Sequence, residues 1–147
     1  MATIYKQEMD AGVAGAIVTC IEGNLQSYTV EDVAGLGFGL AVAQGANDKG
    51  TRLVKTGDTS DKFIGVSVLD RTAGDLINGK FPQYNDARIM KRGIIWVTVT
   101  EDVKANDAAA VDLATGKFNK SGAAFKNAKF RTSAVAGQIA QLEIFGG

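Results

Sequence analysis

Short apolar segments separated by glycine-containing turns are the feature that most constrains this chain. They recur at roughly 8–12-residue intervals, as in β-sandwiches and β-barrels. The sequence has 18 glycines but one proline in 147 residues. Glycine reaches positive φ angles without a steric cost, which suits tight turns between strands. No segment shows the 3.6-residue apolar period of a long amphipathic helix. The pattern therefore predicts an all-β fold, a compact β-barrel or sandwich of short antiparallel strands.

The strongest single strand is predicted over residues 88–100. Ile95, Val97 and Val99 occupy alternate positions, so they share one face of an extended strand, and Trp96 lies on the opposite face. Such alternation is typical of a strand with one face toward the core. Further strands are expected over residues 13–21, 40–43, 51–55, 63–69 and 138–145.

Between and before the strands, the sequence predicts turns, a loop and an arm. Residues 114–117 (ATGK) predict a hairpin turn, with Gly116 where a left-handed conformation is needed. Residues 71–85 carry no clear pattern, so an exposed loop is expected there. The length fits one domain. We expect an extended N-terminal arm over residues 1–12 and a single β domain over residues 13–147.

Composition disfavours secretion, membrane insertion and nucleic-acid binding. The N-terminus lacks the basic region and apolar stretch of a signal peptide, and no segment is apolar over a membrane-spanning length. Basic and acidic residues both number 16, so the formal net charge is zero, whereas proteins that bind phosphate backbones usually carry a positive excess. We expect a protein made in a reducing cytoplasm, with neither nucleic acid nor membrane as partner.

The residues needed for common enzymatic chemistry are missing or poorly placed. The chain has no histidine, which excludes Ser-His-Asp and Cys-His sites and removes the commonest metal ligand. Cys20 is the only cysteine and lies among apolar residues, so an inert buried thiol is expected. The sequence therefore predicts a protein that is not an enzyme, with no catalytic residues, no metal site and no cofactor.

Two carboxylate pairs are the remaining catalytic candidates. They are Asp58 with Asp61 and Glu101 with Asp102. Both pairs fall in turn segments, where Asp is common because its side chain accepts hydrogen bonds from the nearby backbone. Solvated turns are therefore the favoured interpretation for both pairs.

One stretch of the chain is basic without any acidic residue. Between Leu113 and Leu142 there are five basic residues, so the rest of the chain has 11 basic against 16 acidic residues. This stretch is either a solvated hairpin face or a basic surface that docks on an acidic partner. Trp96, the only tryptophan, either caps a barrel end or anchors an interface. The five basic residues are Lys117, Lys120, Lys126, Lys129 and Arg131.

Three segments resemble the structural cement, or capsid decoration, proteins of tailed bacteriophages. They are residues 39–43 (GLAVA), residues 63–71 (FIGVSVLDR) and a strand–turn–strand unit over residues 93–118. The resemblance covers about residues 35–147. The family often has Gly-Asp before the hairpin, where this chain has Asn106-Asp107, a mild departure because Asn also tolerates positive φ.

The resemblance implies a β-barrel-like protein on the exterior of the virion capsid. Its partners would be the major capsid protein and other copies of itself, as a homotrimer or alternatively a homodimer, and it would stabilise the head against internal DNA pressure. We expect the capsid or subunit interface to include arm residues Ile4, Tyr5 and Met9, together with Trp96 and the five basic residues. Two alternatives are a carbohydrate- or cell-surface-binding β module of a virion and a tail-tube structural protein.

Overall fold

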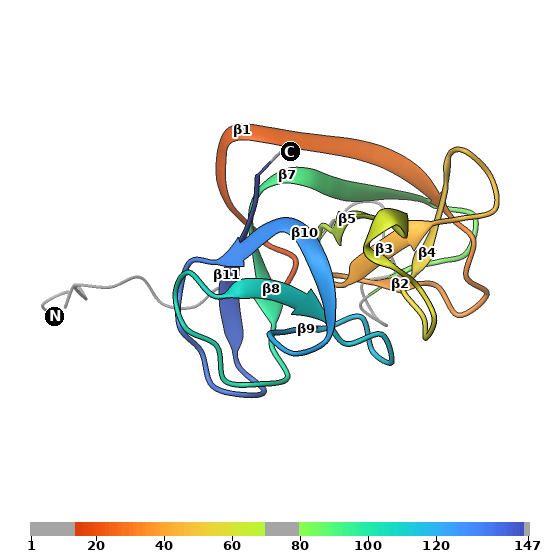
Figure 1. Cartoon of the computed structure of the whole chain (residues 1–147). Helices are drawn as coiled ribbons and strands as arrows, with labels where there is room; N and C mark the ends of the chain where they lie inside the picture. The colour runs from red at the N-terminus through yellow and green to blue at the C-terminus, as the bar shows by residue number, and fades with distance from the viewer. Residues whose placement is uncertain (1–13, 70–79, 146–147) are drawn as a thin grey trace, which may run out of the picture.

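The computed structural model describes residues 14–69 and 80–145, and these residues form an all-β fold (Figure 1). Two strands are much longer than the others, β1 and β7, and they run side by side across the molecule. The single helical element is a short 3-10 turn within the described residues. The elements are β1 (Ile17–Val30), β2 (Leu36–Gly37), β3 (Ala41–Gln44), β4 (Gly50–Leu53), η1 (Ser60–Lys62), β5 (Phe63–Ser67), β6 (Lys80–Phe81), β7 (Asp86–Thr98), β8 (Ala108–Val111), β9 (Phe118–Asn119), β10 (Ala123–Phe130) and β11 (Ile139–Ile144).

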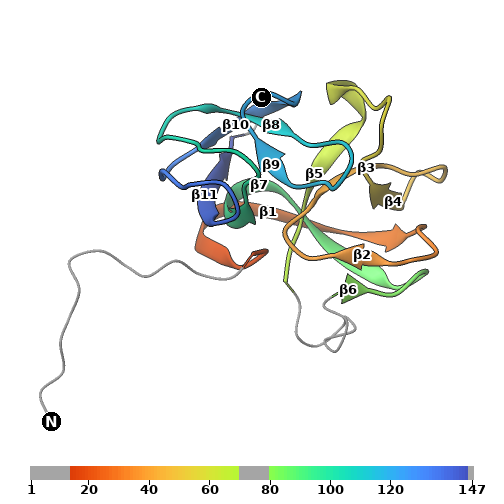
Figure 2. The same cartoon turned by 90° about the horizontal axis from the view of Figure 1, so that it is seen from below.

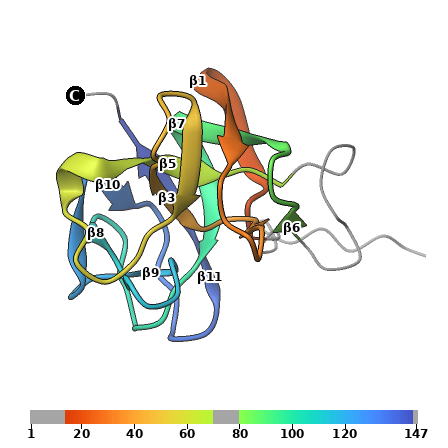
Figure 3. The same ribbon diagram turned by 90° about the vertical axis from the view of Figure 1, so that its right-hand side faces the viewer.

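Five strands close into a mixed barrel in the order β1-β4-β3-β5-β7, with β7 pairing back to β1. Four of these pairings are antiparallel, and β1 with β4 is parallel. Closure leaves no free strand edge within the ring, which protects a small sheet from pairing with other chains. Figure 3 shows β1, β3, β5 and β7 around this barrel.

A second group of strands extends from the far half of β7 in the order β7-β11-β10-β8-β9. This sheet curls back on itself, because a parallel bridge joins Val99, just after β7, to Phe118 in β9. The Thr100 N–H donates a hydrogen bond to the Phe118 carbonyl at 2.9 Å. We call the sheet formed by β7, β11, β10, β8 and β9 the curled sheet. In Figure 2, β8, β9, β10 and β11 gather on one side of the molecule and β2 and β6 lie on the other.

Each region has its own apolar core. The barrel interior contains Tyr28, Val30, Val42 and Ile89, all buried, and is closed by Phe81 at one end. A larger core lies between the outer face of the barrel strands and the inner face of the curled sheet. Its members on β7 and just beyond are Ile95, Val97 and Val99, and its aromatic members are Phe118, Phe125 and Phe130.

Gly65 shows why the barrel needs a glycine in β5. Strand β5 crosses β7 so closely that a Cβ on Gly65 would lie 2.2 Å from the Met90 carbonyl oxygen. Real Cβ atoms do not approach backbone to that distance. The adjacent Val66 pairs with Met90 in register, so the close approach belongs to the barrel closure itself.

The structure confirms the predicted fold class, the shared face of Ile95, Val97 and Val99, and the turn at Gly116, whose φ is +78°. Two local predictions were wrong. Strand β1 does not end near residue 21 but continues to Val30, and register shifts in its pairing with β7 interrupt the alternation that would have indicated it. Residues 80–81 form β6, with Phe81 fully buried, rather than part of an exposed loop.

Other sequence predictions lie outside the described residues. These are the arm over residues 1–12, residues 71–79 of the expected loop, and the side chain of Cys20. In the part of the chain that the structure describes, no helix is long and apolar enough to cross a membrane.

Candidate interaction surface

The outer face of the curled sheet brings Trp96 together with two of the predicted basic residues. Ile95 and Val97 point into the core, so Trp96 between them points outward, and it is half-buried. Gln141 on β11 is opposite Trp96, and the Arg131 N–H donates to the Gln141 carbonyl at 2.8 Å. Arg131, Gln141 and Trp96 therefore lie in one row, which runs from the end of β10 across β11 to β7.

A second row runs parallel to the first. Lys129 on β10 is opposite Glu143 on β11, which is opposite Ile94 on β7. Arg131 Nε lies 3.8 Å from Glu143 Oε2, which links the two rows. The Lys129 ammonium lies 5.7 Å from the ring centroid of Phe145, an exposed aromatic residue. We call the two rows the Trp96 face, and its residues are Ile94, Trp96, Lys129, Arg131, Gln141 and Glu143.

This face combines an aromatic side chain with exposed charged side chains. Two basic side chains stand beside one acidic side chain, and both members of the Arg131–Glu143 pair are substantially exposed. Exposed pairs of this kind contribute little to folding, because solvent screens them and holding two long side chains costs entropy. The charges therefore remain available for a partner.

The beginning of the described chain is fixed at the edge of the Trp96 face. The Gly15 N–H donates to the Trp96 carbonyl at 2.8 Å, and the Trp96 N–H donates to the Ala16 carbonyl at 3.0 Å. The Gly15 carbonyl also accepts from Leu69 N–H at 2.9 Å. Gly15 has a φ of +87°, and a Cβ there would lie 2.9 Å from the Gly39 nitrogen. The residues before it, including Ile4, Tyr5 and Met9, lie outside the described part.

The other three basic residues of the stretch occupy different surroundings. Lys117 is exposed in the turn between β8 and β9. Lys126 on β10 is exposed and forms an ion pair with Asp61 at 2.8 Å, which lowers the pKa of that carboxyl through the hydrogen bond. Lys120 lines a groove beside β9. The structure therefore brings Lys129 and Arg131 to Trp96 and places the remaining three elsewhere.

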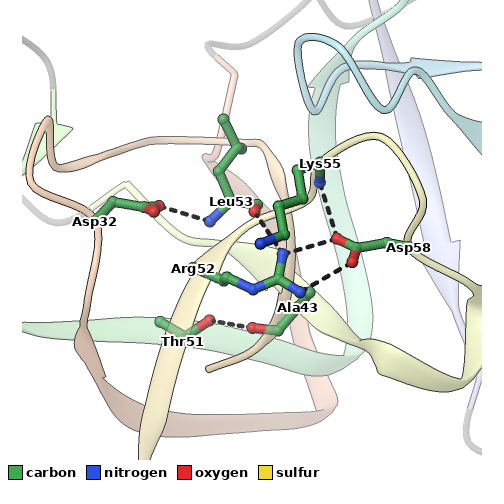
Figure 4. Close-up of polar contacts among 7 residues, drawn as sticks. All are labelled: Asp32, Ala43, Thr51, Arg52, Leu53, Lys55 and Asp58. Atoms are coloured by element: carbon green, nitrogen blue, oxygen red, sulfur yellow. Dashed lines mark hydrogen bonds and ion pairs between the residues drawn. The ribbon is translucent and has the colours of Figure 1, made fainter. Parts of the chain in front are cut away.

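Asp58 has a structural role that its sequence context did not predict. Its carboxylate accepts two hydrogen bonds from Arg52, at 2.8 and 2.9 Å, and a third from the Lys55 N–H at 2.8 Å (Figure 4). The hydrogen bond from Arg52 is the main reason why the pKa of Asp58 falls to about 2. Asp58 is in a turn, as expected, but it is only 8% exposed, so the prediction of a solvated carboxylate was wrong for this residue.

The second carboxylate pair also serves the fold. Asp102 accepts a hydrogen bond from the Ala136 N–H at 2.9 Å, and Glu101 accepts one from the Ser121 hydroxyl. These bonds join the loop after β7 to other loops of the curled sheet. Among the side chains that the structure describes (residues 14–17, 25–69 and 80–145), no three His, Cys, Asp or Glu residues are grouped so that they could hold a metal ion.

Sequence reasoning found some members of the Trp96 face but not their arrangement. Trp96, Lys129 and Arg131 were predicted as interface residues from their types and from the charge pattern. Gln141 and Glu143 were missed, although their alternation with Leu142 and Ile144 placed them on one face of the last strand. What was missing is the pairing of β11 with both β7 and β10, which joins segments far apart in the sequence.

The described residues thus define a small protein with a five-stranded β-barrel that is extended by the curled sheet. The chain belongs to the phage structural cement protein family: the family model described as structural cement protein (E217 gp24/Pam3 gp6) matches residues 1–145. This match confirms the resemblance seen in the sequence. The family is structural, which also confirms the prediction that the chain is not an enzyme.

A solved structure shares the fold over nearly the whole length. A chain from a structure titled "The capsid of Myoviridae Phage XM1" superposes with a TM-score of 0.74 and 21% sequence identity. The match covers 99% of this chain and 98% of the other. No curated protein matches this chain.

Proposed function

We propose that this cement protein binds the outer surface of the major capsid protein lattice and stabilises the head against internal DNA pressure. The observation that carries the proposal is the Trp96 face, where an aromatic side chain and two basic side chains adjoin the base of the N-terminal segment. The similar chain belongs to a structure whose title names a phage capsid. Membership of the cement family favours this function over the carbohydrate-binding and tail-tube alternatives.

The proposed mechanism is additive contact. Trp96 supplies a large apolar anchor of the kind that dominates binding energy at interfaces. Lys129 and Arg131 orient the protein against an acidic part of the capsid surface. Residues 1–12 extend the contact beyond the folded body, with Ile4, Tyr5 and Met9 as apolar contacts. We propose a homotrimer, or alternatively a homodimer, whose several weak contacts act together through a high effective concentration.

The experiment measures attachment to purified capsids that lack the protein. Trp96→Ala should weaken attachment by about 30-fold, as truncation of an aromatic anchor usually does. Attachment should also weaken as salt rises, because the basic residues contribute electrostatically. Deleting residues 2–10 should weaken attachment while thermal unfolding stays unchanged.

A matched control replaces Tyr84, an exposed aromatic side chain in the turn between β6 and β7 and not part of the Trp96 face. Tyr84→Gly also removes an aromatic ring, and it relieves a positive φ of 66°. It should attach like the wild type. Equal attachment of the wild type, the Trp96 variant and the deletion variant would refute the proposal, and salt-independent attachment would remove the electrostatic part.

A further inference from the structure

A second surface feature is a groove formed by two loops of the curled sheet. It has a volume of about 580 Å³ and lies between the loop after β7 and the connection from β10 to β11. Val103 and Ala134 form an antiparallel bridge across these loops, with hydrogen bonds of 2.9 and 3.0 Å. Val135 extends the apolar lining, and Lys104 and Lys120 lie along it.

The groove is held in shape by hydrogen bonds between its two loops, in addition to the bridge of Val103 and Ala134. Asp102 accepts the Ala136 N–H, and the Ser133 hydroxyl accepts the Ala105 N–H at 3.2 Å. These bonds tie the two loops together from both sides. The groove is therefore preformed, and a ligand would not have to order it.

The chemistry of the lining fits an apolar side chain flanked by carboxylates. Val135 is 59% exposed and lines the groove together with the apolar Val103 and Ala134. Lys104 and Lys120 are exposed, and neither ammonium group makes an ion pair with any residue in the described ranges. A segment with one apolar side chain between two acidic ones would bury the apolar lining and pair with both lysines.

The N-terminal segment of this chain has this pattern, with Met9 between Glu8 and Asp10. We infer that the groove binds the N-terminal segment of a neighbouring copy, with Met9 on the apolar floor and the two carboxylates at Lys104 and Lys120. The inference rests on the proposed function, in which this segment makes contacts beyond its own folded body, and it identifies one partner of that segment.

The segment is long enough to reach a neighbour. Thirteen residues precede the described chain, and at about 3.5 Å per residue they span up to roughly 45 Å. A folded chain of 147 residues has a radius of gyration of about 15 Å. The reach is thus about three times that radius, which is sufficient to connect adjacent copies on a capsid surface.

The test is a charge exchange between groove and segment, followed by sedimentation equilibrium of the full-length chain. The wild type should associate within a range up to about 100 µM. One variant, Lys104→Glu with Lys120→Glu, reverses the charge of the groove. The other variant, Glu8→Lys with Asp10→Lys, reverses the charge of the N-terminal segment. Each variant alone should associate at least about tenfold more weakly, because like charges then face one another.

Mixing the two variants should restore association. The positively charged segment of one variant then meets the negatively charged groove of the other. Val135→Asp should weaken association without unfolding the protein, because this side chain is mostly exposed. Lys49→Glu with Lys55→Glu makes the same charge change at exposed lysines outside the groove lining and should associate like the wild type.

Three outcomes would overturn the inference: a wild type that stays monomeric, single variants that associate as well as the wild type, or a mixture that does not regain association. The last outcome is also the one expected if the segment bound the groove of its own chain. Failure of the proposed function would be seen separately, as a wild type that does not attach to capsids, because sedimentation involves no capsid.

Discussion

The barrel and the curled sheet share β7 but differ in the side chains that their outer faces present. On the barrel side, carboxylates bind the protein's own backbone: Glu31 accepts the Ala46 and Asn47 N–H groups, and Asp32 accepts the Leu53 N–H. In the curled sheet, Lys129 and Arg131 stay exposed beside Trp96. We propose that the barrel is a scaffold and that the curled sheet carries the contacts.

The basic stretch lies in the curled sheet, but that region is not strongly charged overall. All five basic residues of the stretch lie on β9, β10 or the adjoining turns. Acidic residues of the same sheet and its loops nearly balance them: Glu101, Asp102, Asp107, Asp112 and Glu143. The basic stretch is therefore a local feature of one part of the curled sheet and not a difference in net charge between the two regions.

The largest expected effect is on the scaffold, from Gly65→Ala. The new methyl group would meet the Met90 carbonyl at 2.2 Å, so β5 and β7 would have to separate. We expect a loss of about 3 kcal/mol in the free energy of unfolding, measured by urea denaturation. Gly57→Ala is the matched control, since Gly57 has a φ of +96° but nothing within 4 Å of an added Cβ. It should cost about 1 kcal/mol. A loss no larger than that of Gly57→Ala would show that β5 and β7 accommodate the methyl group without separating.

The second-largest expected effect on the free energy of unfolding comes from breaking the ion pair of Arg52 and Asp58. Asp58→Asn would leave Arg52 largely buried without its charge partner, at a cost of about 2 kcal/mol at neutral pH. Because folding lowers the pKa of Asp58 from 3.8 to about 2, its stabilisation is fully present above the unfolded value and is lost as the pH falls through about 2. The difference between wild type and variant in urea denaturation should therefore shrink from pH 5 toward pH 2. A difference that is constant over this range would contradict the assignment.

The smallest effect on folding is expected in the curled sheet, from Arg131→Glu. Its ion pair with Glu143 is long and exposed, so the free energy of unfolding should change by no more than about 0.5 kcal/mol. Attachment to capsids at low salt should nevertheless weaken several-fold, as measured by cosedimentation. Arg88→Glu, on the barrel half of β7 and exposed, is the control. If the control weakened attachment as much as Arg131→Glu did, the contacts would not be confined to the curled sheet.

Local patterns predicted the strand around Ile95 and the turn at Gly116, because alternation and glycine act over neighbouring residues. The sequence did not reveal the length of β1, since its pairing with β7 is interrupted by register shifts. It also could not show that Phe81 closes the barrel, because that position is set by the pairing of β6 with the distant Leu36. For the same reason, Trp96, Lys129 and Arg131 were predicted as interface residues, but the strand pairing that aligns them in two rows was not.

The division between scaffold and contact surface is tested most directly by a cryo-electron microscopy reconstruction of capsids decorated with the protein. We predict that Trp96, Lys129 and Arg131 face the major capsid protein, while the barrel end bearing β2 and β6 does not. A reconstruction with that barrel end against the lattice, and the Trp96 face exposed to solvent, would contradict it.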